Sequence, residues 1–257
     1  MSASDRPYRK VLVERTAEEA TTTAATLLKT IVCEAVSQRG ACHVALAGGT
    51  TPHALYQKLA AEGASGEVPW RSMEVFFGDE RDVGQDNVES NYRMVQRTLL
   101  DHVPIEPTKV YPMRGDAEDL QAAASEYEQA IRRLLPAGAG GLPRFDLILL
   151  GMGGDGHTAS LFPGSEALNE GKKLVTSHYV PVLGRRRLTF TFPLVNAARN
   201  ILLLVTGEDK AKAVLGILTD DQESRQLLPA GRIAPTDGIL YVILDAAAAR
   251  LTGLTHA

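Results

Sequence analysis

The residues of this chain that could do chemistry gather in glycine-rich segments that follow apolar runs. The richest lies within residues 146–163, where an apolar run passes into Gly-Met-Gly-Gly-Asp-Gly-His and ends at His157. Glycines allow positive φ and let a ligand approach the backbone, and histidine can move a proton near neutral pH. His157 therefore fits a general base that takes a proton from water, and Asp155 is close enough in sequence to orient its ring.

The same segment also satisfies the spacing of a dinucleotide-binding loop, because Gly151, Gly153 and Gly156 match G-x-G-x-x-G. That fingerprint requires a helix of useful length after the glycines and an acidic residue about 20 positions further on. Pro163 would end such a helix early, and residues 175–177 offer no acid. The sequence therefore disfavours a dinucleotide cofactor at this segment.

A second glycine-rich segment, residues 47–52, reads Ala-Gly-Gly-Thr-Thr-Pro and precedes a helical pattern. Exposed N–H groups at the start of a helix attract anions, and either Thr50 or Thr51 could cap this helix, with Pro52 at its first position. The segment predicts a phosphate site without the Gly-Lys-Ser/Thr ending of a nucleotide-binding loop, and the alternative is an ordinary strand-to-helix turn. The predicted phosphate-binding residues are Gly48, Gly49, Thr50 and Thr51.

Cationic side chains follow three further predicted strands or open them. Arg81 lies in a charged loop, where its planar guanidinium suits a phosphate or carboxylate, and Asp79 or Glu80 could hold it or bind sugar hydroxyls. Lys210 is expected in the first turn of a helix, and Arg187 opens an alternating run. The alternative for each cation is a solvated surface side chain.

The elements that must position these residues are predicted from apolar runs with helical patterns between most of them. The runs lie at residues 11–13, 43–47, 73–77, 147–150, 201–205 and 240–244. Such alternation predicts an α/β fold, a largely parallel open sheet with helices on both faces in a Rossmann-like three-layer sandwich. Ligands bind outside the carboxyl ends of the strands in such sheets, so the segments described above are expected to meet there.

Two helices and a strand pair have clear signals of their own. Thr16 and Glu19 form a capping-box pattern, and the apolar stripe that follows ends near Gly40. A second stripe begins near Asp116 and continues to about residue 134. The alternating residues within 175–192 predict a strand pair or strand extension.

The composition bounds the class of protein. A chain of 257 residues with 44% hydrophobic and 23% charged residues can bury one substantial core, so we expect a single domain over residues 1–257. A formal net charge of -4 gives no general attraction to nucleic acid or to an anionic membrane. Cys33 and Cys42 form neither a disulfide framework nor a metal motif, and no apolar run approaches a membrane span. We therefore expect a cytoplasmic protein, monomeric or a small homo-oligomer.

Six blocks in the sequence resemble the 6-phosphogluconolactonase family, in the family's order, between about residues 8 and 250. They read Ala-Gly-Gly-Thr-Thr-Pro, Phe-Gly-Asp-Glu-Arg, Ser-Asn-Tyr, Gly-Met-Gly-x-Asp-Gly-His-Thr-Ala-Ser-Leu-Phe-Pro, Arg-Leu-Thr-x-Thr-x-Pro and Thr-Gly-x-x-Lys-Ala. One departure concerns the stretch before the fifth block, which is often proline-rich in the family and here carries three arginines. Arg187 aligns with the family's arginine, and Arg185 or Arg186 could serve instead.

The resemblance implies hydrolysis of a small sugar-phosphate lactone, 6-phospho-D-glucono-1,5-lactone, to 6-phosphogluconate in the pentose phosphate pathway, without metal or organic cofactor. By analogy, His157 activates water at the lactone carbonyl and Asp155 positions His157. Arg81, together with Lys210 and the loop of Gly49 and Thr50, binds the phosphate and adjacent polar groups. Backbone N–H groups of the glycine loop or Arg81 could stabilise the oxyanion. The substrate-binding residues that the resemblance implies are Gly48, Gly49, Thr50, Thr51, Asp79, Arg81, Gly153, Arg187 and Lys210.

Two alternatives are weighed against a lactonase. The glucosamine-6-phosphate deaminase branch of the same superfamily carries Asp-Glu-Tyr where this chain has Asp-Glu-Arg, and a glutamate after its histidine where this chain has none. A sugar-phosphate sensor is the non-enzymatic alternative, since related domains lie behind DNA-binding heads in regulators. With the first strand expected near Lys10, we expect no room for such a head.

Overall fold

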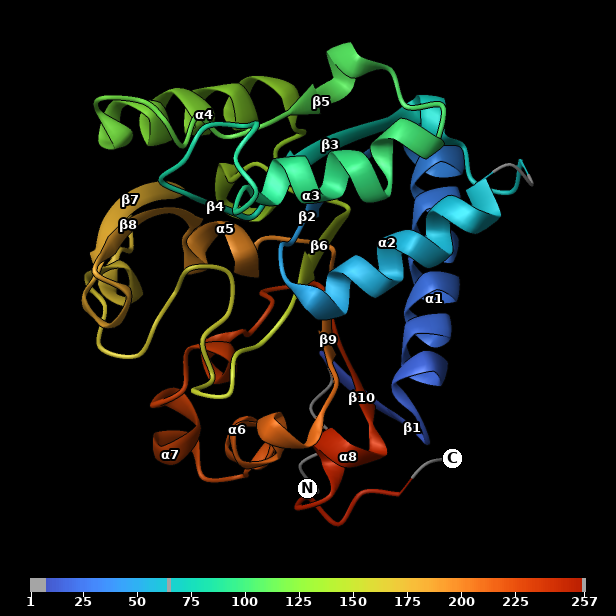
Figure 1. The fold of residues 1–257 in the computed structure, drawn as a ribbon, viewed down its shortest axis with the longest axis vertical. Coiled ribbons are helices and arrows are strands. Elements are labelled where there is room, and N and C mark those ends of the chain that lie inside the picture. The colour runs from blue at the N-terminus through green and yellow to red at the C-terminus, as the bar shows by residue number, and fades with distance from the viewer. Residues whose placement is uncertain (1–7, 64–65, 256–257) are drawn as a thin grey trace.

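The computed structural model describes residues 8–63 and 66–255, and an extended parallel sheet runs through the middle of the molecule (Figure 1). Within the described residues this sheet has seven strands in the order β1-β10-β9-β6-β2-β3-β5, and all the pairings are parallel. The strands are β1 (Arg9–Glu14), β2 (Cys42–Leu46), β3 (Met73–Phe77), β5 (Val110–Tyr111), β6 (Leu147–Leu150), β9 (Asn200–Val205) and β10 (Ile239–Asp245). The six apolar runs all form strands, which confirms the predicted fold class.

Helices cover both faces of this sheet, and each face has its own hydrophobic cluster. On one face α1 (Ala17–Arg39), α2 (Thr50–Glu62) and α3 (Asn91–Thr98) pack against side chains such as Val44 and Leu46. On the other, α4 (Leu120–Leu134), α5 (Phe192–Asn196), α6 (Ala211–Leu218) and α8 (Ala246–Ala249) pack against Ala45 and its neighbours. Burial on both faces explains why the strands read as continuous apolar runs. The short helix α7 (Gln222–Gln226) follows α6.

The ends of α1 lie where the capping signals predict them. The Thr16 side chain accepts a hydrogen bond from the Glu19 N–H at 3.1 Å, and Gly40 ends the helix at φ 79°. The Glu19 carboxylate accepts from the Arg15 N–H at 3.0 Å, and the Thr16 N–H also acts on it. The helix therefore begins as expected.

The prediction that the second helix starts near Asp116 is wrong by about one turn. Helix α4 begins at Leu120, and the Asp119 carboxylate accepts hydrogen bonds from the Gln121 and Ala122 N–H groups at 2.9 Å each. Asp119 caps better than Asp116 because its oxygen reaches the free N–H groups of the first turn.

A second, smaller sheet contains β4 (Asp79–Arg81), β8 (Arg185–Phe190) and β7 (Val175–Val180), in that order and antiparallel. The β7–β8 pair confirms the strand pair predicted within 175–192. The charged segment that was expected to be a loop is in fact strand β4. Its neighbour Gly78 donates to the Leu46 carbonyl at 2.9 Å and accepts from the Phe190 N–H at 2.8 Å, so one residue joins the two sheets.

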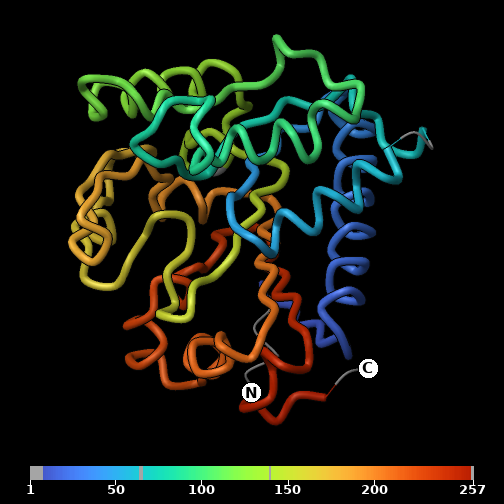
Figure 2. The backbone as a smooth tube through the Cα atoms, viewed as in Figure 1, coloured from blue at the N-terminus to red at the C-terminus, as the bar shows by residue number. Residues whose placement is uncertain are grey.

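The segment that carries His157 is fixed on both sides by hydrogen bonds. It passes between the small sheet and the chain that follows α7 (Figure 2). The Gly156 carbonyl accepts from the Ala230 N–H at 2.9 Å, and the Ser160 N–H donates to the Thr189 hydroxyl at 3.2 Å. None of the helices in the described ranges is long and apolar enough to cross a bilayer.

Candidate active site

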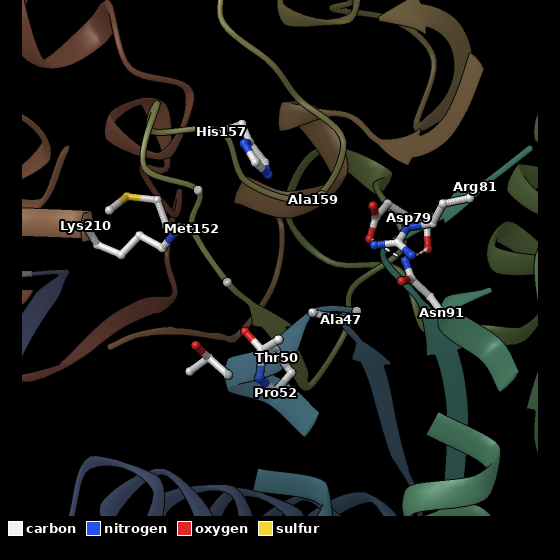
Figure 3. Close-up of a pocket in the computed structure, with 15 residues that line it drawn as sticks. Ala47, Thr50, Pro52, Asp79, Arg81, Asn91, Met152, His157, Ala159 and Lys210 are labelled. Atoms are coloured by element: carbon white, nitrogen blue, oxygen red, sulfur yellow. Dashed lines mark hydrogen bonds between the residues drawn. The ribbon is translucent and has the colours of Figure 1, made fainter. Parts of the chain in front are cut away.

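A cavity of about 240 Å³ opens at the carboxyl ends of β2, β3, β6 and β9. It brings together the two glycine-rich segments and the segments that carry Arg81 and Lys210, which follow separate strands in the sequence, as expected for a parallel sheet. Figure 3 shows Lys210 on one side of the cavity, Arg81 on the opposite side and His157 between them. The lining residues are Ala47, Gly48, Gly49, Thr50, Thr51, Pro52, Asp79, Arg81, Asn91, Gly151, Met152, Gly153, His157, Ala159 and Lys210.

His157 and Asp155 form a hydrogen-bonded pair. The His157 Nδ1 lies 2.6 Å from Asp155 Oδ1, and the His157 backbone N–H donates to the same oxygen at 3.1 Å. The carboxylate at Nδ1 assigns the ring proton there, which leaves Nε2 as a proton acceptor. Partial burial acts to raise the pKa of Asp155, but the hydrogen bonds and charge of His157 outweigh it, so this pKa is lowered. The ring also stacks on Phe162 at a centroid separation of 4.2 Å.

Glycine is required at position 153 for this pair to form. A Cβ on Gly153 would lie 2.2 Å from both Cε1 and Nδ1 of His157 and 2.7 Å from Asp155 Oδ1. The Gly153 N–H donates to the His157 carbonyl at 2.9 Å, which closes the turn around the pair. The absence of a side chain at Gly153 therefore leaves room for the His157 ring beside Asp155, and it also keeps the cavity open.

The phosphate-type segment begins helix α2 in a different way from the prediction. Gly49 is the N-cap at φ 99°, and no side chain caps the helix, so neither Thr50 nor Thr51 has that role. Pro52 is the third helical residue rather than the first. The N–H groups of the first turn are thus left for a ligand. The Thr51 hydroxyl lies 3.1 Å from the Thr206 hydroxyl, which links this turn to the segment that carries Lys210.

Lys210 borders the same end of the cavity. It closes a short 3₁₀ turn (Glu208–Lys210) ahead of α6, and its Nζ lies 2.7 Å from Asp209 Oδ2. The side chain of Asp209 is largely exposed, so this ion pair is screened by water. An anion in the cavity can therefore compete for Lys210 at small cost.

The side of the cavity opposite Lys210 holds two acceptors and a cation. Asp79 is 7% exposed and Asn91 is 2% exposed. The Asn91 Nδ2 donates to the carbonyl and the Oδ1 of Asp79, at 3.0 and 3.2 Å, and Ser160 Oγ donates to Asp79 Oδ2 at 2.7 Å. Sequence reasoning missed Asn91, whose only signal was its place in the Ser-Asn-Tyr block.

Arg81 and Arg187 are paired across strands β4 and β8, but only Arg81 lines the cavity. The Arg81 guanidinium donates to the Glu89 carbonyl. Arg187 donates to the Arg186 carbonyl at 2.8 Å and lies 3.5 Å from Asp82. Burial, together with the nearby charge of Arg81, lowers the pKa of Arg187. Arg187 is thus held by Asp82 and its own strand, close to the cavity residues Arg81 and Asp79, whose charges act on it, and its contact with substrate stays a prediction.

The other two candidate arginines also lie outside the cavity lining. Arg185 forms ion pairs with Asp82 and Glu89 at 2.9 and 2.7 Å, and Arg186 is exposed to solvent. Within the described residues, no group of three or more His, Cys, Asp and Glu side chains is arranged to hold a metal ion.

The family model for glucosamine-6-phosphate isomerases/6-phosphogluconolactonase matches residues 15–242. The chain belongs to this family. The 6-phosphogluconolactonase of a Synechocystis strain is 38% identical over 235 residues, which are 91% of this chain and 92% of that protein. A probable chloroplastic 6-phosphogluconolactonase of Oryza sativa subsp. indica is 42% identical over 221 residues, which are 82% of this chain and 66% of that protein.

Solved structures of this isomerase/lactonase family agree with the fold. The 6-phosphogluconolactonase of Trypanosoma brucei superposes with a TM-score of 0.79 at 32% identity and covers 93% of this chain and 97% of its own. The likeness therefore extends over nearly the whole length of both chains.

Proposed function

We propose that this chain hydrolyses 6-phospho-D-glucono-1,5-lactone to 6-phospho-D-gluconate in the oxidative pentose phosphate pathway. The observation that carries the proposal is the His157–Asp155 pair, which faces the same cavity as an uncapped helix N-terminus and Lys210. A proton acceptor and an anion site within one small cavity suit hydrolysis of a phosphorylated substrate. The family and its lactonase members support the same reaction.

In the proposed reaction, His157 Nε2 takes a proton from a water molecule, whose oxygen attacks the lactone carbonyl carbon C1. The carbonyl oxygen becomes an oxyanion, to which backbone N–H groups of the glycine loop or the Arg81 guanidinium can donate. The bond from C1 to the ring oxygen then breaks, and the protonated His157 returns the proton to that oxygen. Asp155 holds Nδ1 and stabilises the charged ring while it carries the extra proton. The acid product ionises in solution.

The two ends of the cavity suggest how the substrate lies. Lys210 and the first turn of α2 together offer a positive charge and free N–H donors, so we place the phosphate there. Arg81 lies on the opposite side of the cavity (Figure 3). It is therefore better placed for the carbonyl end of the lactone than for its phosphate.

Both cysteines are free thiols, as a reducing compartment allows, and we propose a cytoplasmic location.

The deciding experiment measures lactone hydrolysis on freshly generated 6-phosphogluconolactone, by coupled oxidation of 6-phosphogluconate against the spontaneous rate. His157→Ala should lower kcat by about 10²–10⁴-fold, the usual contribution of a general base, with KM nearly unchanged. Comparable turnover in the variant would refute the role of His157. Glucosamine 6-phosphate is tested in parallel: ammonia release alone would assign the chain to the deaminase branch, and neither activity would favour a sensor.

A further inference from the structure

Asn91 is fixed so that its two amide atoms have different surroundings. Its Nδ2 lies within 3.0 Å of the Asp79 carbonyl and 3.2 Å of Asp79 Oδ1, and both of these atoms are acceptors. Only the amide nitrogen can occupy that position, since an oxygen there would face two other oxygens. The amide oxygen Oδ1 must therefore point the other way.

The Asn91 Oδ1 faces the cavity wall beside Gly48. A Cβ on Gly48 would lie 1.8 Å from this oxygen, so the absence of a side chain at position 48 makes room for it. No hydrogen bond between described residues is made to Asn91 Oδ1; the side chain bonds through Nδ2 alone. Asn91 lines the cavity, and Oδ1 is not among the fully buried atoms that have no partner, so it is accessible from the cavity. A ligand or water in the cavity can therefore donate to this oxygen.

The position of Asn91 is set from behind by a buried carboxylate. Glu80 is 1% exposed and accepts hydrogen bonds from Ser90 Oγ, the Asn91 N–H and the Tyr92 N–H, at 3.0, 2.8 and 2.9 Å. Burial raises the pKa of Glu80, and the backbone N–H donors of Tyr92, Asn91 and Arg81 act against the rise. Ser90 caps the helix by accepting from the Arg93 N–H at 3.2 Å. Helix α3 therefore starts at a fixed point, and Asn91 is its first residue.

Asp79 completes an acceptor pair with Asn91. Its carboxylate accepts from Ser160 Oγ on one side and from Asn91 Nδ2 on the other, which fixes its orientation at the cavity wall. Figure 3 shows Asp79 and Asn91 beside Arg81, on the side of the cavity away from Lys210. Two preorganised acceptors next to a guanidinium suit neighbouring hydroxyl groups close to a carbonyl.

We propose that Asn91 contacts the substrate and determines its specificity, with Oδ1 accepting a hydrogen bond from a lactone hydroxyl at C2 or C3. This inference rests on the proposed function, because the phosphate at the Lys210 end places C2 and C3 toward Asp79 and Asn91. An amide oxygen accepts and cannot donate, so a lactone that lacks the hydroxyl leaves Oδ1 unpaired. The site thus rejects deoxy analogues by the loss of this partner.

The test compares kcat/KM for 6-phosphogluconolactone with that for its 2-deoxy and 3-deoxy analogues, followed by acid release at constant pH. The wild type should prefer the parent lactone over at least one analogue by about tenfold or more, the effect of one buried hydrogen bond. Asn91→Ala should lower activity on the parent and remove most of that preference. Asn91→Ser serves as a second variant, because it keeps a small polar residue at the start of the helix.

The matched control is Asn87→Ala, in the exposed loop before α3, where Asn87 Oδ1 accepts from the Glu89 N–H at 2.9 Å. This control should retain the wild-type preference. Wild-type preference ratios in folded Asn91→Ala and Asn91→Ser would overturn the assignment while the proposed function stands. A wild type inactive on the parent lactone would instead remove the proposed function, and the assignment with it.

Discussion

Substitution of Gly153 tests the proposed mechanism while the side chains of His157 and Asp155 are both kept. In Gly153→Ala the new Cβ would lie 2.2 Å from two His157 ring atoms, whereas real Cβ contacts essentially never fall below 3.0 Å. The ring must therefore retreat by about 0.8 Å or more, and the 2.6 Å contact with Asp155 is lost or distorted. Misplacement of a catalytic group by about 1 Å can cost roughly 10²-fold in rate.

We therefore expect kcat of Gly153→Ala to fall by about 10²-fold in the coupled lactonase assay. KM should change little, because the turn at Gly49 and Lys210 belong to other segments. Gly171→Ala is the matched control, since a Cβ there would meet no atom within 4 Å. Thermal unfolding of both variants separates a displaced ring from a lost fold. A folded Gly153→Ala enzyme with kcat within threefold of the wild type would refute the argument.

Two further predictions concern Lys210, which follows the carboxyl end of β9, and Asp146, which directly precedes β6. Lys210→Ala should raise KM about tenfold or more with little change in kcat, because the variant loses one charged hydrogen bond to the phosphate. Steady-state kinetics measure both constants, and a larger effect on kcat than on KM would mean that Lys210 acts in the chemical step. Asp146 is 1% exposed, and its carboxylate lies 3.0 Å from Arg39 Nε and accepts from the His43 N–H at 2.9 Å. Asp146→Ala should therefore lower the free energy of unfolding, measured by urea titration, by about 3 kcal/mol. The kcat of the folded variant should be unchanged. Burial acts to raise the pKa of Asp146, but His43 and Arg39 lower it overall. The folded-state pKa thus lies below the unfolded value, so the charge-dependent part of this stabilisation is present above about pH 4 and is lost as the pH falls further. The difference in stability between wild type and variant should therefore narrow at low pH.

Most of the parallel sheet could be predicted because its sequence signals lie in residues that are neighbours along the chain. Of the seven strands in the described residues, six are short apolar runs, and the inner ones are largely buried on both faces, whereas the two-residue edge strand β5 gave no such signal. The carboxyl-end rule then places Gly49, His157 and Lys210 together. The ends of α1 were likewise marked by Thr16 and Gly40. These features depend on residues that are neighbours in sequence, so a single chain is enough to reveal them.

The parts that could not be predicted depend on partners far away in sequence. Strand β4 is a short charged segment that becomes a strand only because β8, more than 100 residues later, pairs with it. Asn91 carries no chemical motif, and it reaches the cavity only because Glu80 binds the start of α3. Arg187 was expected to contact ligand, and this stays a prediction; the acceptors that hold its side chain, the Arg186 carbonyl and Asp82, could not be foreseen from the sequence.

The two ends of the cavity are built from separate parts of the molecule. The turns after β2 and β9 of the main sheet supply Gly49 and Lys210 at the proposed phosphate end, while the small sheet and the start of α3 supply Asp79, Arg81 and Asn91. Because the two ends belong to separate elements, a substitution at one end need not move the other. We therefore expect changes in the small sheet to alter the choice of ring while the binding of the phosphate is retained.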